Sequence, residues 1–392
     1  MLAACITADF FFKNAHLQGD EVTVYYPGQA PLAYNEVRVK EAQTQSTAND
    51  TKHIGVAGDC GIAVATKTQS GSYRFDLEHK AAYLCFLPYI ANNLNRTVLK
   101  SITVHCDSTI SGVFTLTANG IKAKENNGHV ITLQTGGEGG FLLPQSATQN
   151  ISAYMVIAPQ NGSSRLTCEF TVYDTELQST GVYTKIVDLA AIEPNMVYVV
   201  KANCNNYVVD LGLPVKFLNH NMGSTCPEEH GGYYAWGELE DKGNYTTGNY
   251  TYQNTAFSEL PKNIRLTNMD VAHMRLGQNF SMPTSAEMNM LVDSCTWVWL
   301  PLNGKAGYRI TGKNNNVLFL PAAGYRNGTG DNEKNSRGLY RSSQLTSSGA
   351  KQNWYLNFYS SSKVVEQSGT DIWLGESIRP VVSTGMQMTD SS

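Results

Sequence analysis

The sequence of 392 residues is poor in charge, since Asp, Glu, Lys and Arg make up only 16% of it, against about 25% in typical soluble domains. It has no run of basic residues and a net charge of −4, so the counterion release that drives nucleic-acid binding is missing. No segment approaches the roughly 18 consecutive apolar residues that a membrane-spanning helix needs. These absences argue against a nucleic-acid partner and predict no helical membrane span.

The eight cysteines lack the CxxC spacing that marks zinc and redox sites. Cys85, Cys106 and Cys168 lie in apolar or alternating segments, which predicts buried thiols that pack as small hydrophobic groups. One or two disulfides are the alternative, which sequence spacing does not decide. We therefore predict no metal site and no cofactor.

The segment Leu2-Ala-Ala-Cys5 matches the lipidation box of bacterial lipoproteins. A complete signal has a charged and then an apolar segment of about 7–15 residues before the box, whereas only Met1 precedes Leu2 here. The match is either chance or the remnant of an export signal. Cys5 is the candidate lipidation site, and we expect no intact targeting peptide.

Strand signals dominate residues 1–206. Short alternating or apolar segments, separated by Gly, Asn and Pro, are typical of β-sandwiches. In RLTCEFTVY the alternation places Leu166, Cys168, Phe170 and Val172 on one face, and the continuous apolar run SAYMVIAP predicts a central strand. The other segments include EVTVYYP, GSYRFDLEHKAAYLCFLPY (two strands with a turn at residues 78–80), VLKSITVHC and NMVYVVKANC.

Polar segments suggest the boundaries of three domains, at residues 1–93, 94–206 and 207–392. In the last of these, helix signals appear. PTSAEMNMLVDSC has a capping box, Thr284 with Glu287 three residues on, followed by apolar residues at helical spacing. TNMDVAHMRLG predicts a second helix with Thr267 as its cap and Gly277 as its stop. This region reads as a mixed α+β domain.

Residues 1–206 resemble the fimbrillin family, the type V pilins of Gram-negative anaerobes. The resemblance lies in VTVYYPG, HIGVAGDCGIA, YRFDLEHKAAYLCFLPY, VLKSITVHCD, SGVFTLT and AYMVIAPQ. It implies two tandem transthyretin-like β-sandwich domains. It also implies polymerisation by donor-strand exchange, in which one subunit supplies a strand to an exposed edge of the next.

Residues 207–392 resemble a C-type-lectin-like domain that is repeated in surface proteins of the same bacteria. The matching segments are VDLGL, GYYAWGE, MPTSAE, FLPAAGYRNG and RPV. The fold class expected for the whole chain is therefore mainly β: two sandwiches followed by an α+β lectin-like domain. A related fold occurs in copper-dependent oxidases with a close cysteine pair, but Cys226 and Cys295 have no vicinal partner.

The stretch GGYYAWGE at residues 231–238 is open to two interpretations, a sugar-stacking platform or a piece of core. Tryptophan buries a very large area, and the resemblance makes this segment part of the framework. We therefore expect Trp236 in the core.

The polar, glycine-rich segment from Tyr325 to Arg341 is the predicted contact surface, because loops on a rigid scaffold commonly carry binding. The candidate ligand-binding residues are Arg326, Asn327, Asp331, Asn335 and Arg341. The acidic GDNEKNSRG within it could offer oxygen ligands to calcium, but it lacks the spacing of a calcium loop, and a solvated loop is the preferred interpretation. No nucleophile-and-base motif appears, so we expect no enzyme.

The resemblances imply an adhesive tip subunit of a cell-surface fimbrium, exported via the outer membrane. Such a subunit would bind other pilin subunits through its N-terminal sandwich. The polar end, STGMQMTDSS, has no strand pattern to donate, and the lectin-like domain would face a glycan or protein receptor. The alternative is a stand-alone surface lipoprotein that binds glycans.

Overall fold

The computed structural model describes residues 9, 11, 17–30, 32–92, 94–124, 128–277 and 279–383, without the side chains of 367 and 368. Strands account for 46% of the chain and helices for 8%, so the prediction of a mainly β protein is confirmed. Cys5 lies outside the described residues, as does the segment after residue 383. No helix in the described ranges is long and apolar enough to cross a bilayer.

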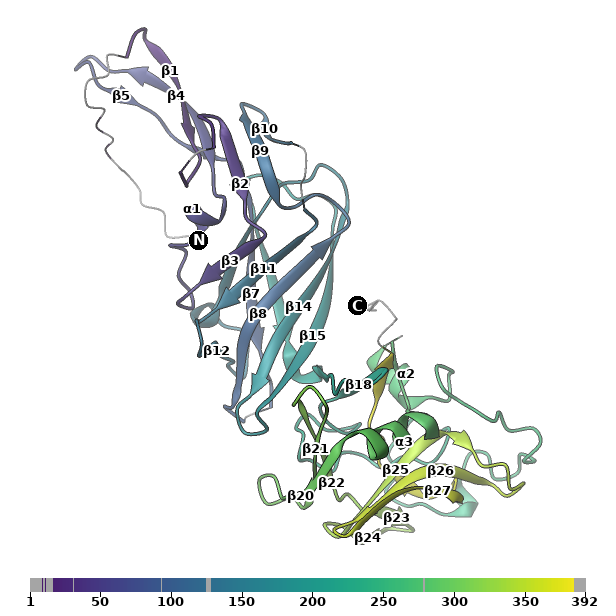
Figure 1. The fold of residues 1–392 in the computed structure, drawn as a ribbon. Helices are drawn as coiled ribbons and strands as arrows, with labels where there is room; N and C mark the ends of the chain where they lie inside the picture. The colour runs from purple at the N-terminus through teal and green to yellow at the C-terminus, as the bar shows by residue number, and fades with distance from the viewer. Residues whose placement is uncertain are drawn as a thin grey trace. The chain divides into compact units, whose positions relative to one another are not determined.

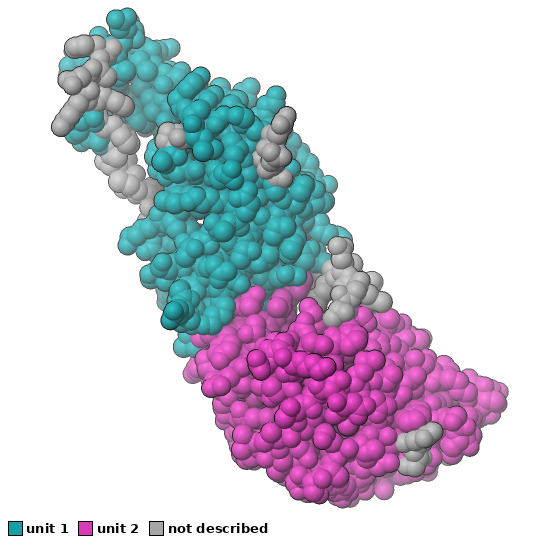
Figure 2. Space-filling view, viewed as in Figure 1, with its two compact units in different colours: residues 1–89, 99–170, 185–202 teal, residues 90–98, 171–184, 203–392 magenta. Residues whose placement is uncertain are grey.

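The chain forms two compact units (Figures 1 and 2). Unit 1 comprises residues 1–89, 99–170 and 185–202, and unit 2 comprises residues 90–98, 171–184 and 203–392. Strands from before residue 93 pair with strands from after it, as β3 does with β11 and β7 with β13. The units are defined by mutual packing and do not test the three predicted domain ranges, which stay a prediction.

Unit 1 holds one short helix, α1 (Ile54–Ala57), and the following strands or parts of strands: β1 (Glu21–Tyr26), β2 (Glu36–Val39), β3 (Ala42–Gln45), β4 (Gly61–Lys67), β5 (Tyr73–Arg74), β6 (Glu78–His79), β7 (Ala82–Tyr89), β8 (Thr97–Cys106), β9 (Gly112–Thr117), β10 (Gly120–Ala123), β11 (Val130–Thr135), β12 (Phe141–Leu142), β13 (Ala153–Ile157), β14 (Ser164–Asp174), β15 (Ser179–Leu189) and β16 (Val197–Asn203). The predicted turn at residues 78–80 therefore contains a short strand, β6, which pairs with β4.

Two sheets of unit 1 face each other across its core. One has the order β13-β7-β16 and the other β15-β14-β8-β11-β3. The rings of Phe86 on β7 and Phe170 on β14 meet edge to face, with centroids 5.6 Å apart. The four residues Leu166, Cys168, Phe170 and Val172 are all fully buried, as the alternation of β14 predicts. This packing is that of a β-sandwich.

Strand β13 lies at the edge of its sheet, whereas its apolar sequence predicts a central strand. Side chains from the β3 segment close this edge. The amide of Gln43 bonds both the N–H (2.9 Å) and the C=O (2.7 Å) of Val156. The amide of Gln45 accepts from the N–H of Tyr154 (2.7 Å) and donates to the C=O of Ser152 (3.0 Å). All five residues of β13 are buried, although within the described ranges no strand pairs with it on this side.

Unit 2 contains helices α2 (Val271–Leu276) and α3 (Ser285–Ser294) and small sheets. Its strands are β17 (Val208–Val209), β18 (Val215–Leu218), β19 (Phe280–Ser281), β20 (Thr296–Trp299), β21 (Gly307–Thr311), β22 (Val317–Pro321), β23 (Tyr325–Asn327), β24 (Gly330–Asn332), β25 (Arg337–Leu345), β26 (Gln352–Tyr359), β27 (Ser362–Asp371), β28 (Gly375–Glu376) and β29 (Val381–Ser383). The run β19-β29-β18-β17 continues onto β15, where Val208 pairs with Val182, and three further sheets have the orders β20-β21-β22, β24-β23-β28 and β25-β26-β27.

The two predicted helices form, with one corrected cap. Thr284 and Glu287 make the predicted capping box at the start of α3. Helix α2 starts later than expected, because Asp270 and not Thr267 caps it, accepting from the N–H groups of Ala272 and His273. A carboxylate satisfies two of the free N–H groups of a first turn at once. The lectin-like identity of this unit stays a prediction.

The hydrogen bonds from Gln43 and Gln45 to the edge of β13 predict how the protein responds to losing both side chains. Replacing both Gln43 and Gln45 by Ala leaves the outward backbone groups of β13 without partners, at about 1–3 kcal/mol for each group that water does not reach. We expect the double variant to lose roughly 2–5 kcal/mol of unfolding free energy in urea denaturation. Because an open edge is a template for pairing, it should also self-associate in analytical ultracentrifugation.

Gln29→Ala is the matched control, because the Gln29 amide donates to the Arg38 carbonyl at an exposed site. We expect that change to stay within about 0.5 kcal/mol of the parent. A double variant at positions 43 and 45 that is as stable and as monomeric as the parent would contradict the assigned role of the glutamines.

Candidate functional site

The segment predicted as a loop, Tyr325 to Arg341, is largely strand. Tyr325–Asn327 (β23) pairs with Gly330–Asn332 (β24) as a two-residue hairpin, and β23 also pairs with β28. Arg337–Leu345 then forms β25. The exposed part of the segment is thus held on a sheet, which gives its side chains fixed positions.

Three side chains fix the backbone that leads into this hairpin. The hydroxyl of Tyr340 donates to the C=O of Pro321 (2.7 Å), and that of Tyr233 donates to the C=O of Ala323 (2.6 Å). The guanidinium of Arg379 donates to the C=O of Phe319 (2.9 Å). Buried carbonyls that no strand reaches obtain donors in this way.

Gly324 makes the turn between this backbone and β23. Its φ is +65°, and a Cβ added there would lie 2.1 Å from the carbonyl oxygen of Asn332. Only glycine fits this position, because any side chain would meet backbone as well as an unfavourable φ.

Arg326 is the centre of a charged cluster on the surface of unit 2. Its Nε donates to Asp331 (2.7 Å), its Nη1 lies 3.4 Å from Asp241, and its guanidinium carbon lies 4.7 Å from the centre of the Tyr233 ring. Lys334 also binds Asp331 (2.7 Å). The two cations, through their hydrogen bonds, hold the pKa of the Asp331 carboxyl below its ordinary value.

The charges of the cluster are balanced, because it contains two cations, Arg326 and Lys334, and two carboxylates, Asp241 and Asp331. The nearby carboxylate of Glu333, in the same acidic segment, pairs with Arg337 at 2.7 Å. Those oxygens are therefore already neutralised, which works against the calcium interpretation of this segment. Within the described ranges, no group of three or more His, Cys, Asp and Glu side chains converges as metal ligands would.

The two asparagines of the predicted set lie at turns. Asn327 is exposed and ends β23 opposite Gly330. Asn335 is exposed, has a φ of +66°, and donates its N–H to the carbonyl of Ala322 (2.8 Å). Burial lowers the pKa of the nearby His230 to about 4.

Arg341 does not lie on this surface, which corrects its expected place beside the other four residues. Its side chain is fully buried, 3.4 Å from the equally buried carboxylate of Glu376. It donates to the carbonyls of Tyr234 (3.2 Å) and Leu374 (2.8 Å) and to the side chain of Asn353. Both faces of β25 are covered at this point, since the residues on either side of Arg341 are buried as well. The guanidinium of Arg341 thereby supplies hydrogen bonds to the backbone of two separate loops.

The aromatic segment at residues 231–238 is core, as expected. Trp236 is fully buried, and the neighbouring Tyr233 and Tyr234 are nearly so. The hydroxyl of Tyr250 donates to the Trp236 carbonyl (2.7 Å). A ring with no exposed face offers no platform for a sugar.

No disulfide joins the cysteines of the described ranges. Cys60, Cys85, Cys106, Cys168 and Cys204 are buried, and Cys226 and Cys295 are half-buried. Burial raises the pKa of the Cys168 thiol to about 12. Cys168 is therefore a packing group that keeps its proton at neutral pH.

A second candidate site is the outer strand of unit 1, β1. Among the described residues it pairs with β4 alone, and none of its six residues is buried. Val22, Val24 and Tyr26 are the register partners of Ala65, Ala63 and Gly61 of β4, so the apolar side chains of β1 lie beside a row of small residues in the same sheet. The strand is held by few buried contacts.

Comparison with known proteins adds little. No family model and no curated protein matches the chain. Among solved structures, it is similar to a "putative cell adhesion protein" from Bacteroides ovatus ATCC 8483, with 17% identity over 52% of this chain and 71% of that one. The TM-score is 0.30, and a likeness at that level establishes neither a shared fold nor a shared role.

Sequence reasoning missed three members of the charged cluster: Tyr233, Asp241 and Lys334. Tyr233 and Asp241 lie about 85 or more positions before Arg326, and no motif links them to it. Lys334 is three residues from Asp331, a spacing that could have suggested the pair.

The two arginines of the predicted set should differ sharply in their effect on stability. Arg341→Met leaves the buried Glu376 carboxylate without its cationic partner, which costs about 3–5 kcal/mol of unfolding free energy. Arg326→Met, the matched control on the half-exposed cluster, should cost no more than about 1 kcal/mol. Guanidinium denaturation of both variants measures the difference, and equal losses would refute the buried role of Arg341.

The buried position of His220 predicts that the folded protein loses stability as the pH falls. Its Nδ1 lies 2.9 Å from the carbonyl of Asn221 and its Nε2 lies 3.0 Å from the side-chain amide of Asn206, and burial lowers its pKa to about 4. As pH falls from about 6.5 to 4, the unfolded chain binds a proton that the folded chain resists, so stability falls by about 3 kcal/mol.

Urea denaturation at pH 7 and pH 4 tests this, with His220→Gln expected to show a smaller drop than the parent. If that variant fails to fold, proton NMR of the parent decides. A His220 ring that titrates near pH 6.5 would refute the prediction.

Proposed function

We propose that this chain is an adhesive tip subunit of a cell-surface pilus. It accepts a strand from a pilin subunit through unit 1 and presents the Arg326 surface of unit 2 to a glycan or protein receptor. The observation that carries the proposal is β1, an outer strand with no buried residue that lies beside a row of small residues on β4.

Strand exchange is favourable when the incoming strand buries more apolar surface than the one it displaces. Val22, Val24 and Tyr26 are only half-buried in this chain. A donated strand that buries three apolar side chains fully would gain about 1.5–3 kcal/mol for each. The sum is comparable with the whole stability of a domain, so the joint would be permanent in practice.

The surface of unit 2 supports the binding half of the proposal. Arg326 and Asn327 are held on a hairpin whose backbone is fixed by Tyr233, Tyr340 and Arg379. A rigid surface loses little entropy on binding. Because the charges of the cluster are balanced, recognition there would rest on hydrogen bonds more than on net attraction.

The test uses the full chain and shaft pilin from the same organism. We expect the mixture to form a complex that survives denaturant in gel electrophoresis. Val24→Asp, which places a charge against Ala63 of β4, should speed its formation several-fold by loosening β1. Thr23→Asp, on the other face of β1, is the control and should leave the rate unchanged.

No denaturant-resistant complex with either form would favour the alternative, a stand-alone surface lipoprotein that binds glycans. Antibody labelling of assembled pili provides the second measurement. Label confined to one end of each fibre supports the tip position, and label along the whole fibre excludes it.

A further inference from the structure

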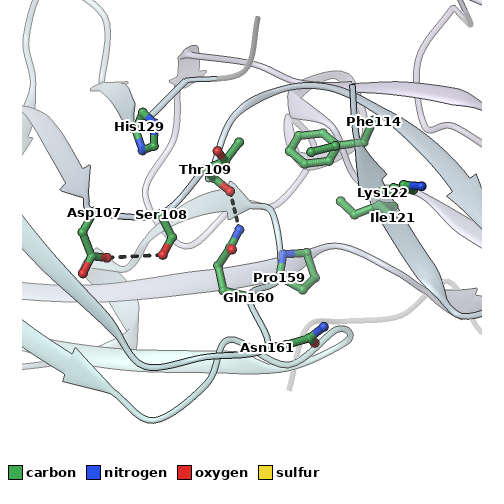
Figure 3. Close-up of a pocket in the computed structure, with 11 residues that line it drawn as sticks. Asp107, Ser108, Thr109, Phe114, Ile121, Lys122, His129, Pro159, Gln160 and Asn161 are labelled. Atoms are coloured by element: carbon green, nitrogen blue, oxygen red, sulfur yellow. Dashed lines mark hydrogen bonds between the residues drawn. The ribbon is translucent and has the colours of Figure 1, made fainter. Parts of the chain in front are cut away.

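Unit 1 has a pocket with a volume of about 560 Å³ (Figure 3). The loop after β8, the β9–β10 hairpin and the loop after β13 surround it. Residues 125–127, which connect two of its lining residues, Ala123 and His129, lie outside the described part of the chain, so the lining does not define a ligand. The sheet β20-β21-β22 of unit 2, by contrast, is described along its whole length.

This sheet has two outer strands, and its register fixes which of their residues turn N–H and C=O outward. Leu300 donates its N–H to Gly307 (3.1 Å), and Ala322 donates its N–H to Ala306 (2.8 Å). Hydrogen-bonded and non-hydrogen-bonded pairs alternate along antiparallel strands. The outward residues are therefore Val317, Phe319 and Pro321 on β22, and Trp297 and Trp299 on β20.

Side chains close the outer edge of β22 but not that of β20. The three outward residues of β22 meet, in order, the hydroxyl of Ser179 (2.8 Å), the guanidinium of Arg379 (2.9 Å) and the hydroxyl of Tyr340 (2.7 Å). The outward N–H and C=O groups of Trp297 and Trp299 have no such partner among the described residues. Strand β20 is therefore an open edge (Figure 1).

The side chains of β20 add apolar surface to this open edge. Val298 and Leu300 lie on one face and are 50% and 46% exposed. Trp297 and Trp299 are half-buried on the other face, and their rings pack edge to face on Tyr308, with centroids 5.1 and 5.0 Å apart. These rings hold the strand in a fixed conformation. Residues 296–304 include no charged residue, whereas charged side chains commonly protect an exposed edge.

The charges around β20 are mostly positive. From residue 293 to residue 321 the sequence carries Lys305, Arg309 and Lys313 against one acid, Asp293. Lys363 of β27 adds a fourth cation, with its Nζ 5.7 Å from the centre of a β20 tryptophan ring. The three lysines form no ion pair and no side-chain hydrogen bond within the described part of the chain. A partner with acidic residues is therefore complementary to this edge.

We propose that the open edge of β20 binds an extended acidic segment of another protein as an added antiparallel strand. The outward backbone groups of the two β20 tryptophans would pair with the backbone of the segment, which is the usual basis of strand addition. Its apolar residues would lie beside Val298 and Leu300, and its acidic residues, on the other face, beside Lys363. The site goes beyond the proposed function, because it uses no residue of β1 or of the Arg326 surface.

The probe is a capped synthetic peptide of alternating Glu and Val that is long enough to span β20. Binding to the full chain is measured by fluorescence anisotropy of the labelled peptide. We expect saturable binding, and at least about tenfold weaker binding of the matched peptide that has Lys in place of each Glu, because the charges around the edge are positive.

Backbone methylation of the peptide separates strand pairing from attraction between charges. In the added strand the Glu residues lie opposite the two tryptophans, so their N–H groups face β20 and the N–H groups of Val face away. Methylating two Glu nitrogens should weaken binding about tenfold or more, because carbonyls of β20 lose their donors. Methylating two Val nitrogens is the matched control and should leave the affinity almost unchanged.

Val298→Glu tests the location, because Val298 is exposed and a carboxylate there repels the acidic peptide. We expect at least about tenfold weaker binding by this variant. Val199→Glu, at an exposed valine of β16 in unit 1, is the matched control and should bind like the parent. If Val298→Glu fails to fold, the methylated peptides decide on the parent protein.

Four results would overturn the proposal: no saturable binding of the acidic peptide, equal binding of the Lys peptide, equal binding of the two methylated peptides, or full binding by a folded Val298→Glu variant. Sedimentation of the full chain alone tests the other occupant. A dimer that Val298→Glu abolishes would assign the edge to a second copy of the chain, and would overturn the proposal as well.

Discussion

Buried backbone polar groups that no neighbouring strand reaches are the constraint on which this structure depends. Each such group costs free energy unless it finds a partner. In unit 1 the amides of Gln43 and Gln45 supply the partners along β13. In unit 2 the buried guanidiniums of Arg341 and Arg379 supply them to the loop carbonyls.

The two arginines explain how unit 2 keeps a defined surface with little regular structure. Burial lowers the pKa of Arg379 to about 10, so it stays charged at neutral pH and donates to the carbonyls of Leu218, Asn219 and Phe319. A side chain with several fixed donors suits this task better than lysine does. The hairpin that carries Arg326 is rigid because this frame holds the backbone before it.

The two units offer different chemistry to a partner. In unit 1, β1 is a weakly held outer strand whose six residues are all exposed or partly buried. In unit 2, Arg326 and Asp331 neutralise each other, so a ligand there must compete with existing ion pairs. Recognition at such a balanced surface depends on shape and hydrogen bonds.

The sequence by itself determined the β character, the inward face of β14 and the capping box of α3, because each follows from local periodicity or local hydrogen bonds. It also indicated the burial of Trp236, because tryptophan has a very large apolar area to bury. Only the tertiary structure decided that β13 is an edge strand, that Arg341 points inward, and that Asp241 and Tyr233 meet Arg326. A buried strand has the same apolar sequence whether its edge is paired with another strand or closed by glutamine side chains, so the sequence does not tell an edge strand from a central one. Contacts between residues about 85 or more positions apart leave no local pattern to read.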